Sequence, residues 1–246
     1  MPARPNRQVT AMQASGGSRI LIVSPMSFLA RTFMDLTAGD FTFVTAGRRG
    51  RTRSGDDTRV EDDYDLDLER PDIIAGCAER IAAYHPGGLD GVLCLQGVNP
   101  LVGARDMKAE HFHRMLAVNL VGPTLLLQGL ASTLNPNGGV VFVSSIAATQ
   151  GSYDPSYAAA MAALGGLIPS LAAASSHLRS NSATLGLVEN SPVHLGMTPY
   201  FVERHRSRMF QGRLIQAGNV ARLLREFIVH DNLHLVDIPL ILENRT

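Results

Sequence analysis

Two serines and a tyrosine could transfer protons if the fold brings them together. Ser144 and Ser145 end the apolar run "VVFVSS", and Tyr157 opens the alanine-rich stretch "SYAAAMAALGG". A phenol beside a hydroxyl can orient a carbonyl group and exchange a proton with it. The pKa of a free tyrosine is about 10, so the phenol becomes a base at neutral pH only when a cation stabilises the phenolate. Met161 is expected to share the helix face of Tyr157, and it supplies no charge.

The nearest cations along the chain lie outside this stretch. Lys108 is the only lysine. Arg114 is the last cation before the stretch that contains Tyr157, and Arg179 is the first cation after it. Arg179 follows the predicted helix and cannot share the face of Tyr157. The local sequence therefore leaves Tyr157 without a cation, and an arginine brought in from elsewhere in the fold is the alternative.

Alternating strands and helices would have to position these groups. Short apolar, β-branched runs predict strands, and helical spacing of apolar residues predicts helices. The strands are expected at 19–23, 41–47, 90–97, 138–147, 183–190 and 236–243, and the helices at 28–38, 72–85, 108–134, 156–176 and 219–230. This order predicts an α/β protein with a single-domain, Rossmann-like, doubly wound parallel sheet. Residues 1–18 are expected to form a flexible N-terminal tail, and the domain to cover 19–246.

The composition argues against several classes of partner. A net charge of zero gives no reason to expect nucleic acid or an anionic membrane. The N-terminus lacks the apolar segment of a signal peptide, and no stretch is expected to reach the roughly 18 apolar residues of a membrane span. Cys77 and Cys94 lie in apolar stretches and are expected to be buried thiols of a reducing compartment. A soluble, cytoplasmic protein is expected.

The order of these motifs resembles the short-chain dehydrogenase/reductase family. The resemblance covers nearly the whole chain from Arg19, and its most specific parts are Asn119 in "AVNLVG", the serine pair and Tyr157. It implies a serine that orients the substrate carbonyl, a tyrosine that transfers the proton and an asparagine that supports a water relay. The family lysine, which lowers the tyrosine pKa and holds the nicotinamide ribose, is replaced by Met161. Ser145 matches the serine by its place at the strand end, whereas Ser144 keeps the more usual spacing to the tyrosine.

The expected nucleotide site departs from the family pattern. Family members place a glycine-rich turn after the first strand, where backbone N–H groups approach the pyrophosphate. Here the turn is "SPMSFLART", without glycine, and Pro25 removes a donor. The turn "CLQG" keeps only Gly97, and Val193 stands where a glycine would face the nicotinamide.

One feature favours a nucleotide. The resemblance places Arg48 and Arg49 where NADP-preferring relatives bind the 2′-phosphate, and Asp65 and Leu66 where relatives contact adenine. The other interpretation is a solvated basic loop balanced by nearby acids, and we favour it because a 2′-phosphate clamp needs a pyrophosphate cradle. Arg48, Asp65 and Gly97 are therefore interpreted as vestigial cofactor-binding residues.

No metal or hydrolase site is expected. His111 and His113 lie two residues apart on a predicted helix and so point in different directions. His194, His205, His230 and His234 form no ligand spacing, and the serine pair lacks the G-x-S-x-G motif of hydrolases.

The losses together predict a non-catalytic subunit. Asn119, Ser145 and Tyr157 are interpreted as vestigial, with NADP(H) expected in a partner. The resemblance implies a heterotetramer with a catalytically intact short-chain dehydrogenase paralogue, as in aminocoumarin antibiotic biosynthesis. One alternative is a non-redox acid–base enzyme, such as an isomerase, dehydratase or cyclase, that uses Tyr157 and Ser145. Another is a divergent NADP-dependent carbonyl reductase.

Overall fold

A computed structural model describes residues 17–48, 60–209 and 212–240. Almost all of the predicted tail (1–18), Arg49 and the end of the last predicted strand lie outside these ranges.

The described residues form a seven-stranded parallel sheet in the order β3-β2-β1-β4-β5-β6-β7. The single-domain, Rossmann-like doubly wound fold is thereby confirmed. The chain runs outward from β1 through β2 to β3, then returns to β4 on the other side of β1, so the order reverses between β1 and β4. In open parallel sheets such a reversal opens a crevice at the carboxyl ends of the strands. The strands are β1 (Ser18–Val23), β2 (Phe41–Gly47), β3 (Val60–Asp65), β4 (Leu89–Cys94), β5 (Leu134–Ser145), β6 (Arg179–Leu185) and β7 (Asp237–Leu240).

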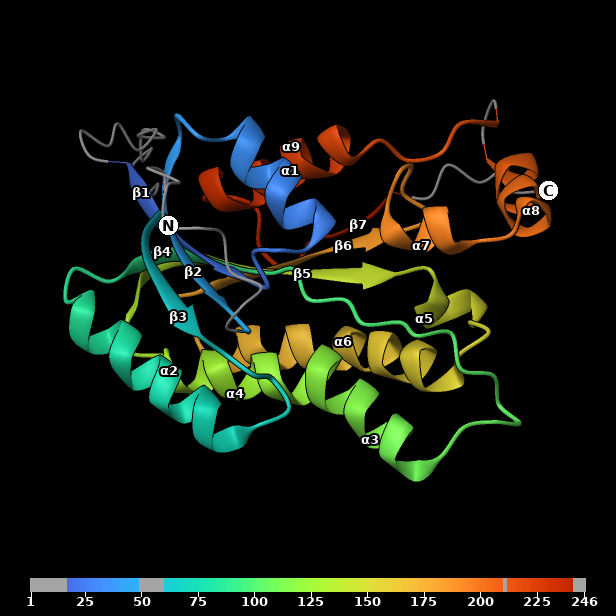
Figure 1. Cartoon of the computed structure of the whole chain (residues 1–246). Coiled ribbons are helices and arrows are strands. Elements are labelled where there is room, and N and C mark those ends of the chain that lie inside the picture. Colours follow the sequence, from blue (N-terminus) through green and yellow to red (C-terminus); the bar gives the residue numbers. More distant parts are fainter. Residues whose placement is uncertain (1–16, 49–59, 210–211, 241–246) are drawn as a thin grey trace, which may run out of the picture.

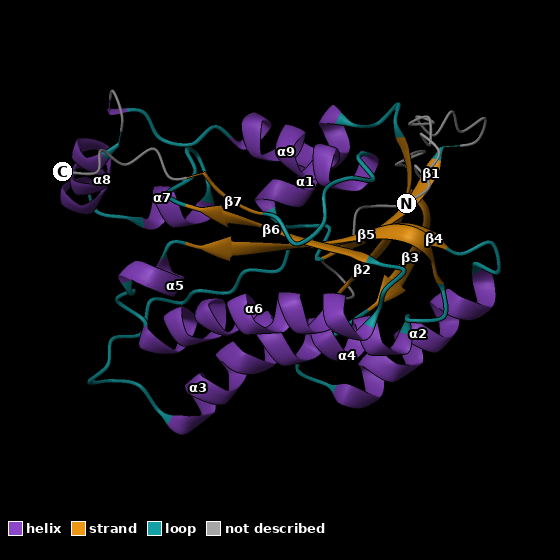
Figure 2. Cartoon of the chain, turned by 180° about the vertical axis from the view of Figure 1, so that it is seen from behind, coloured by secondary structure: helices purple, strands orange, loops and turns teal. Residues whose placement is uncertain are grey.

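Helices cover both faces of the sheet (Figures 1 and 2). α1 and α9 lie on one face, and α2, α3, α4 and α6 on the other, while α5, α7 and α8 lie beyond the carboxyl ends of the strands. Each face has its own apolar core, and Cys77 and Cys94 lie in the core beneath α2, α4 and α6. Burial raises the pKa of both thiols to about 12. The helices are α1 (Phe28–Leu36), α2 (Pro71–Tyr84), α3 (Ala109–Leu116), α4 (Gly122–Gly129), α5 (Ala147–Gln150), α6 (Pro155–Ala174), α7 (Pro192–Gly196), α8 (Pro199–Arg208) and α9 (Ala217–Val229).

Three predicted elements need correction. No strand is expected between those at 41–47 and 90–97, but a charged segment there contains the edge strand β3, whose sequence "VEDDYD" exposes Glu61 and Asp63 and buries Tyr64. The single long helix predicted at 108–134 is divided by a π-helical turn, η1 (Ala117–Val121), and β5 already begins at Leu134. β6 begins at Arg179, because its polar residues find partners in the segment before β7, where Asn181 bonds the backbone of Leu233 and Val236.

α6 also corrects the expectation about membrane spans. Its length and mean hydropathy of 1.5 suffice, by composition alone, to cross a membrane. In this fold the helix packs on the sheet and contributes Ala160, Met161, Leu164 and Ile168 to the core. Only 28% of the most apolar 18-residue stretch of α6 is buried, however, so much of this uncharged helix faces outward.

Candidate functional site

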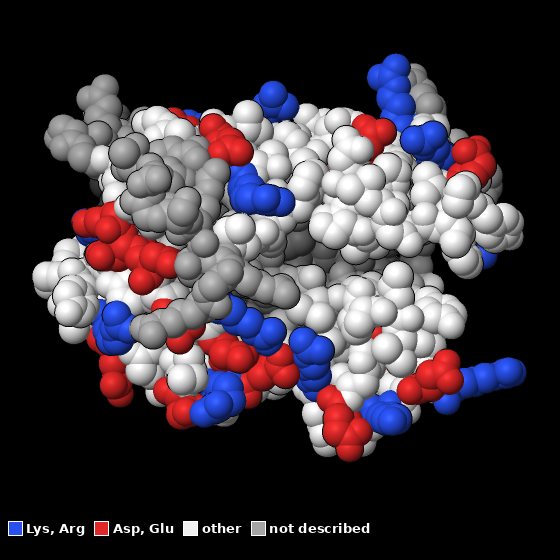
Figure 3. Space-filling model, in the orientation of Figure 1, with Lys and Arg blue, Asp and Glu red and all other residues white. Residues whose placement is uncertain are grey.

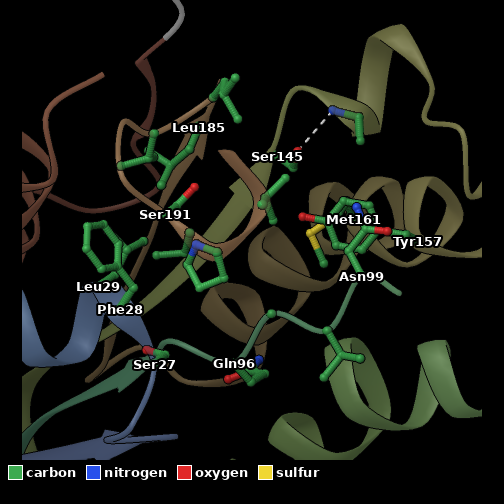
Figure 4. A pocket seen from close by; sticks show the side chains of 18 of the residues that line it. Ser27, Phe28, Leu29, Gln96, Asn99, Ser145, Tyr157, Met161, Leu185 and Ser191 are labelled. Atoms are coloured by element: carbon green, nitrogen blue, oxygen red, sulfur yellow. Dashed lines mark hydrogen bonds between the residues drawn. The ribbon is translucent and has the colours of Figure 1, made fainter. Parts of the chain in front are cut away.

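A cleft of about 1230 Å³ lies at the carboxyl ends of β1, β4, β5 and β6, where the strand order reverses. Figure 3 shows it as a hollow between mostly uncharged walls, and Figure 4 shows the side chains around it. Tyr157, Met161, Ser145 and Gly97 all line it. The volume suits a large organic ligand. No aspartate or glutamate is among the described residues that line it.

Tyr157 lies beside Met161 in the cleft, both carried by the first turns of α6 (Figure 4). Met161 is 3% exposed and packs in the core beneath the helix. Withdrawal from solvent raises the pKa of Tyr157 above its ordinary value, and a hydrogen bond with Ser145 acts in the opposite direction. No cation of the described chain contributes to this shift. The phenol therefore lacks a cation that would favour its phenolate, and its pKa lies above the ordinary value of about 10.

Ser145 is the serine that the fold brings to Tyr157. It ends β5, and its Oγ accepts a hydrogen bond from the backbone N–H of Ala147 at 3.2 Å. Ser144 also lines the cleft, but its neighbour contributes the hydrogen bond that affects the Tyr157 pKa. The position at the strand end thus identifies the partner better than the spacing does.

Asn119 is committed to the backbone. Its side chain is 1% exposed within η1, donates from Nδ2 to the Val98 carbonyl at 3.1 Å and accepts from the Val98 N–H at 3.2 Å. Both ends of the amide therefore hold the segment after β4.

Arg179 does not replace the missing lysine. It begins β6, at the opposite end of the sheet from the cleft, and its guanidinium donates to the carbonyls of Phe227 and Ile228, both at 2.7 Å, and of His230 at 2.9 Å. Desolvation lowers the pKa of this group. The charge caps the carboxyl end of α9, where a cation is favourable.

The residues of the turn after β1 fill the space and use a backbone donor that a phosphate would need. Ser24 has a φ of 63°, in the left-handed region that glycine occupies more readily. The ring of Pro25 lies so close to Gly47 that a Cβ built there would be 2.9 Å from Pro25 Cδ. Ser27 caps α1 by accepting the Ala30 N–H at 3.2 Å. A donor that could serve a phosphate at this helix start is thus already occupied, and the turn does not fit a pyrophosphate as a glycine-rich turn does.

Arg48 reaches the cleft but is paired with acids. Its guanidinium bonds Glu69 and lies 3.4 Å from Asp67 Oδ1. Both carboxylates pair with Nη2 of Arg48 and offset the charge that a 2′-phosphate would need. Asp65 ends β3 and is not among the residues that line the cleft, whereas Gly97 follows β4 at its edge.

Asp154 fixes the start of α6, which carries Tyr157, and was not among the residues predicted from the sequence. Its carboxylate is fully buried at the start of α6 and accepts from the backbone of Tyr157 at 3.2 Å, the Ser156 hydroxyl at 2.5 Å and His111 Nε2 at 2.8 Å. Burial alone would raise its pKa, but the hydrogen bonds outweigh burial and lower it. The pair "DP" is the signal that could have found it, since aspartate favours the N-cap and proline the first helical position.

Asp154→Asn should destabilise the fold by about 2 kcal/mol at pH 7, because an uncharged amide accepts more weakly and turns its N–H₂ toward other donors. The folded pKa of Asp154 is lowered, so its contribution is complete above an unfolded pKa of about 3.9 and is lost as the pH falls through the folded value. Urea unfolding should show the difference between wild type and variant shrinking below about pH 4. The exposed Asp106→Asn is the control, and a pH-independent difference would contradict the prediction.

Comparison with known proteins gives the family. A family model described as "Enoyl-(Acyl carrier protein) reductase" matches residues 44–232 and begins within β2, after the altered turn. Among curated proteins, the human "Dehydrogenase/reductase SDR family member 2, mitochondrial" is 40% identical over 82 residues. That match covers 32% of this chain and 28% of the relative, just over a quarter of its length.

Solved structures agree in fold. A short-chain glucose/ribitol dehydrogenase from Brucella melitensis superposes with a TM-score of 0.82 at 16% identity, covering 92% of this chain and 95% of that one. L-Sorbose reductase from Gluconobacter frateurii, complexed with NADPH and L-sorbose, gives 0.81 at 16% identity, with 93% and 96% covered. At 16% identity these structural similarities are evidence for the fold alone. With the matching family model, they lead to one conclusion: the chain belongs to the short-chain dehydrogenase/reductase family of oxidoreductases.

Proposed function

We propose that this chain is the non-catalytic subunit of a heteromeric, NADPH-dependent short-chain oxidoreductase, of the kind that acts in bacterial antibiotic biosynthesis. A catalytically intact paralogue in the same cytoplasmic complex holds the NADP(H) and transfers the hydride. The observation that carries the proposal is that Tyr157 lies beside Met161, with no cation of the described chain acting on the phenol. A tyrosine in this state cannot serve as the family's base at neutral pH.

The outer face of α6 supports the proposal that the chain assembles with a partner subunit. Ala159, Ala162, Gly166, Ser170 and Ala173 are all exposed along this face. Neither α6 nor η1, which packs against it, contains a charged residue, and Val121 of η1 is 46% exposed. An apolar, charge-free surface of this extent is typical of a subunit interface. In the family, the helices carrying the asparagine and the tyrosine form the main dimer interface.

One observation favours a second candidate. Ser145 and Tyr157 still meet in an open cleft, and a protonated phenol can act as a general acid. A non-redox acid–base enzyme, such as an isomerase, would need this pair and no hydride donor.

The isolated chain should not bind NADPH or NADH in the micromolar range. The turn after β1 offers no glycine backbone, and Arg48 is neutralised by Asp67 and Glu69. Calorimetric titration with each nucleotide measures this directly. A micromolar dissociation constant, about 8 kcal/mol of binding, would support a divergent reductase instead.

A further inference from the structure

Gln96 carries a buried hydrogen-bond acceptor that the fold leaves unused. The residue follows β4, lines the cleft and is 8% exposed. Its Oε1 is buried and has no hydrogen-bond partner in the described part of the chain. Figure 4 shows the side chain at the edge of the cleft, on the side of Ser27. Buried polar atoms are almost always paired, so an unpaired one at a cavity indicates a missing partner.

The surroundings define what that partner must be. Apolar side chains dominate the walls, among them Phe28, Leu29, Val143, Met161, Leu185 and Leu187. Among the lining arginines, Arg48 is paired with acids, and Arg31 and Arg204 are exposed to solvent and not buried in the walls. The unpaired atom is an acceptor, so a pyrophosphate, which can only accept hydrogen bonds, would leave it unpaired. A ligand that donates a hydrogen bond to Gln96 Oε1 would instead satisfy this atom.

We infer that the cleft binds an uncharged, largely apolar organic ligand that donates a hydrogen bond to Gln96. The torsion that turns a glutamine amide is soft, so the carbonyl can swing toward such a ligand at little cost. This site is independent of the subunit role proposed above, because it requires neither assembly nor catalysis. Its failure would appear in small-molecule binding, whereas failure of the subunit role would appear in assembly.

Two isosteric probes test the inference. Indole donates a hydrogen bond from its ring N–H, and benzofuran has an oxygen in that place and donates none. The chain contains no tryptophan, so indole fluorescence can be followed without background from tryptophan, and calorimetry serves both probes. We expect the full-length protein to bind indole about tenfold more tightly than benzofuran, as one hydrogen bond to a buried acceptor allows.

Gln96→Leu should remove this preference by weakening indole to the affinity of benzofuran. Gln128→Leu is the matched control, because Gln128 is exposed on α4 and does not line the cleft, so it should keep the tenfold ratio. Equal affinities of the two probes for the wild-type protein overturn the inference, even if the Gln96 variant does not fold. Failure of both to bind, or displacement of bound indole by micromolar NADPH, overturns it as well.

Discussion

Replacing Ala162 by arginine is expected to abolish assembly while leaving the chain folded. Ala162 is exposed at the middle of the charge-free face of α6, and nothing lies within 4 Å of where a Cβ would stand on nearby Gly165 and Gly166. An exposed arginine at this position should therefore be accommodated by the described part of the chain. In an obligate interface of more than about 2,000 Å², it would place a large charge among close-packed small residues.

The measurement is the mass of the complex after co-expression with an intact short-chain dehydrogenase from the same source. The wild-type chain should give a mixed tetramer, and the Ala162→Arg chain should elute apart from its partner. Ala75→Arg places the same charge on an exposed alanine of α2 and should assemble normally. Normal assembly of the Ala162 variant would show that this face of α6 is not the interface.

The same complex separates the two candidate functions. Tyr157→Phe removes only the phenol oxygen, so it should leave NADPH-dependent activity within about twofold if the partner supplies the catalytic tyrosine. An acid–base enzyme that uses the Ser145–Tyr157 pair should lose about 100-fold or more. Loss of activity in a variant complex that assembles normally would end the non-catalytic proposal.

The sequence predicted the parts of the fold and site that depend on local pattern. Buried strands and amphipathic helices have periodicities that are legible along the chain, and the i, i+4 relation of Tyr157 and Met161 follows from one helix. β3 was not predicted, because an edge strand buries few of its side chains and "VEDDYD" has the composition of a loop.

Contacts between distant residues could not be predicted in this way. Arg48, just after β2, bonds Glu69 in the turn before α2, Pro25 packs on Gly47, and His111 reaches Asp154 from α3. None of these pairs has a sequence spacing that marks it. The unpaired oxygen of Gln96 is of the same kind, since only the packed structure shows which partner a buried group lacks.

Restoring the family lysine is expected to cost stability without creating a reductase. In Met161→Lys, the ammonium would enter a site that is 3% exposed among apolar side chains, at a cost on the order of a few kcal/mol. The charge would lower the Tyr157 pKa, as a neighbouring cation does, and so repair one of the missing parts. The Pro25 contact with Gly47 and the paired Arg48 would remain, so the nucleotide would still lack its phosphate site.

Urea unfolding and NADPH oxidation with a simple ketone test the two halves of this expectation. Met161→Leu is the control, because an apolar residue of similar volume should cost less than about 1.5 kcal/mol. The lysine variant should unfold at clearly lower urea concentration than the leucine variant, and neither should oxidise NADPH above background. Measurable oxidation by the lysine variant alone would mean that the turn "SPMSFLART" does bind a dinucleotide, and that the missing charge was the one obstacle to hydride transfer.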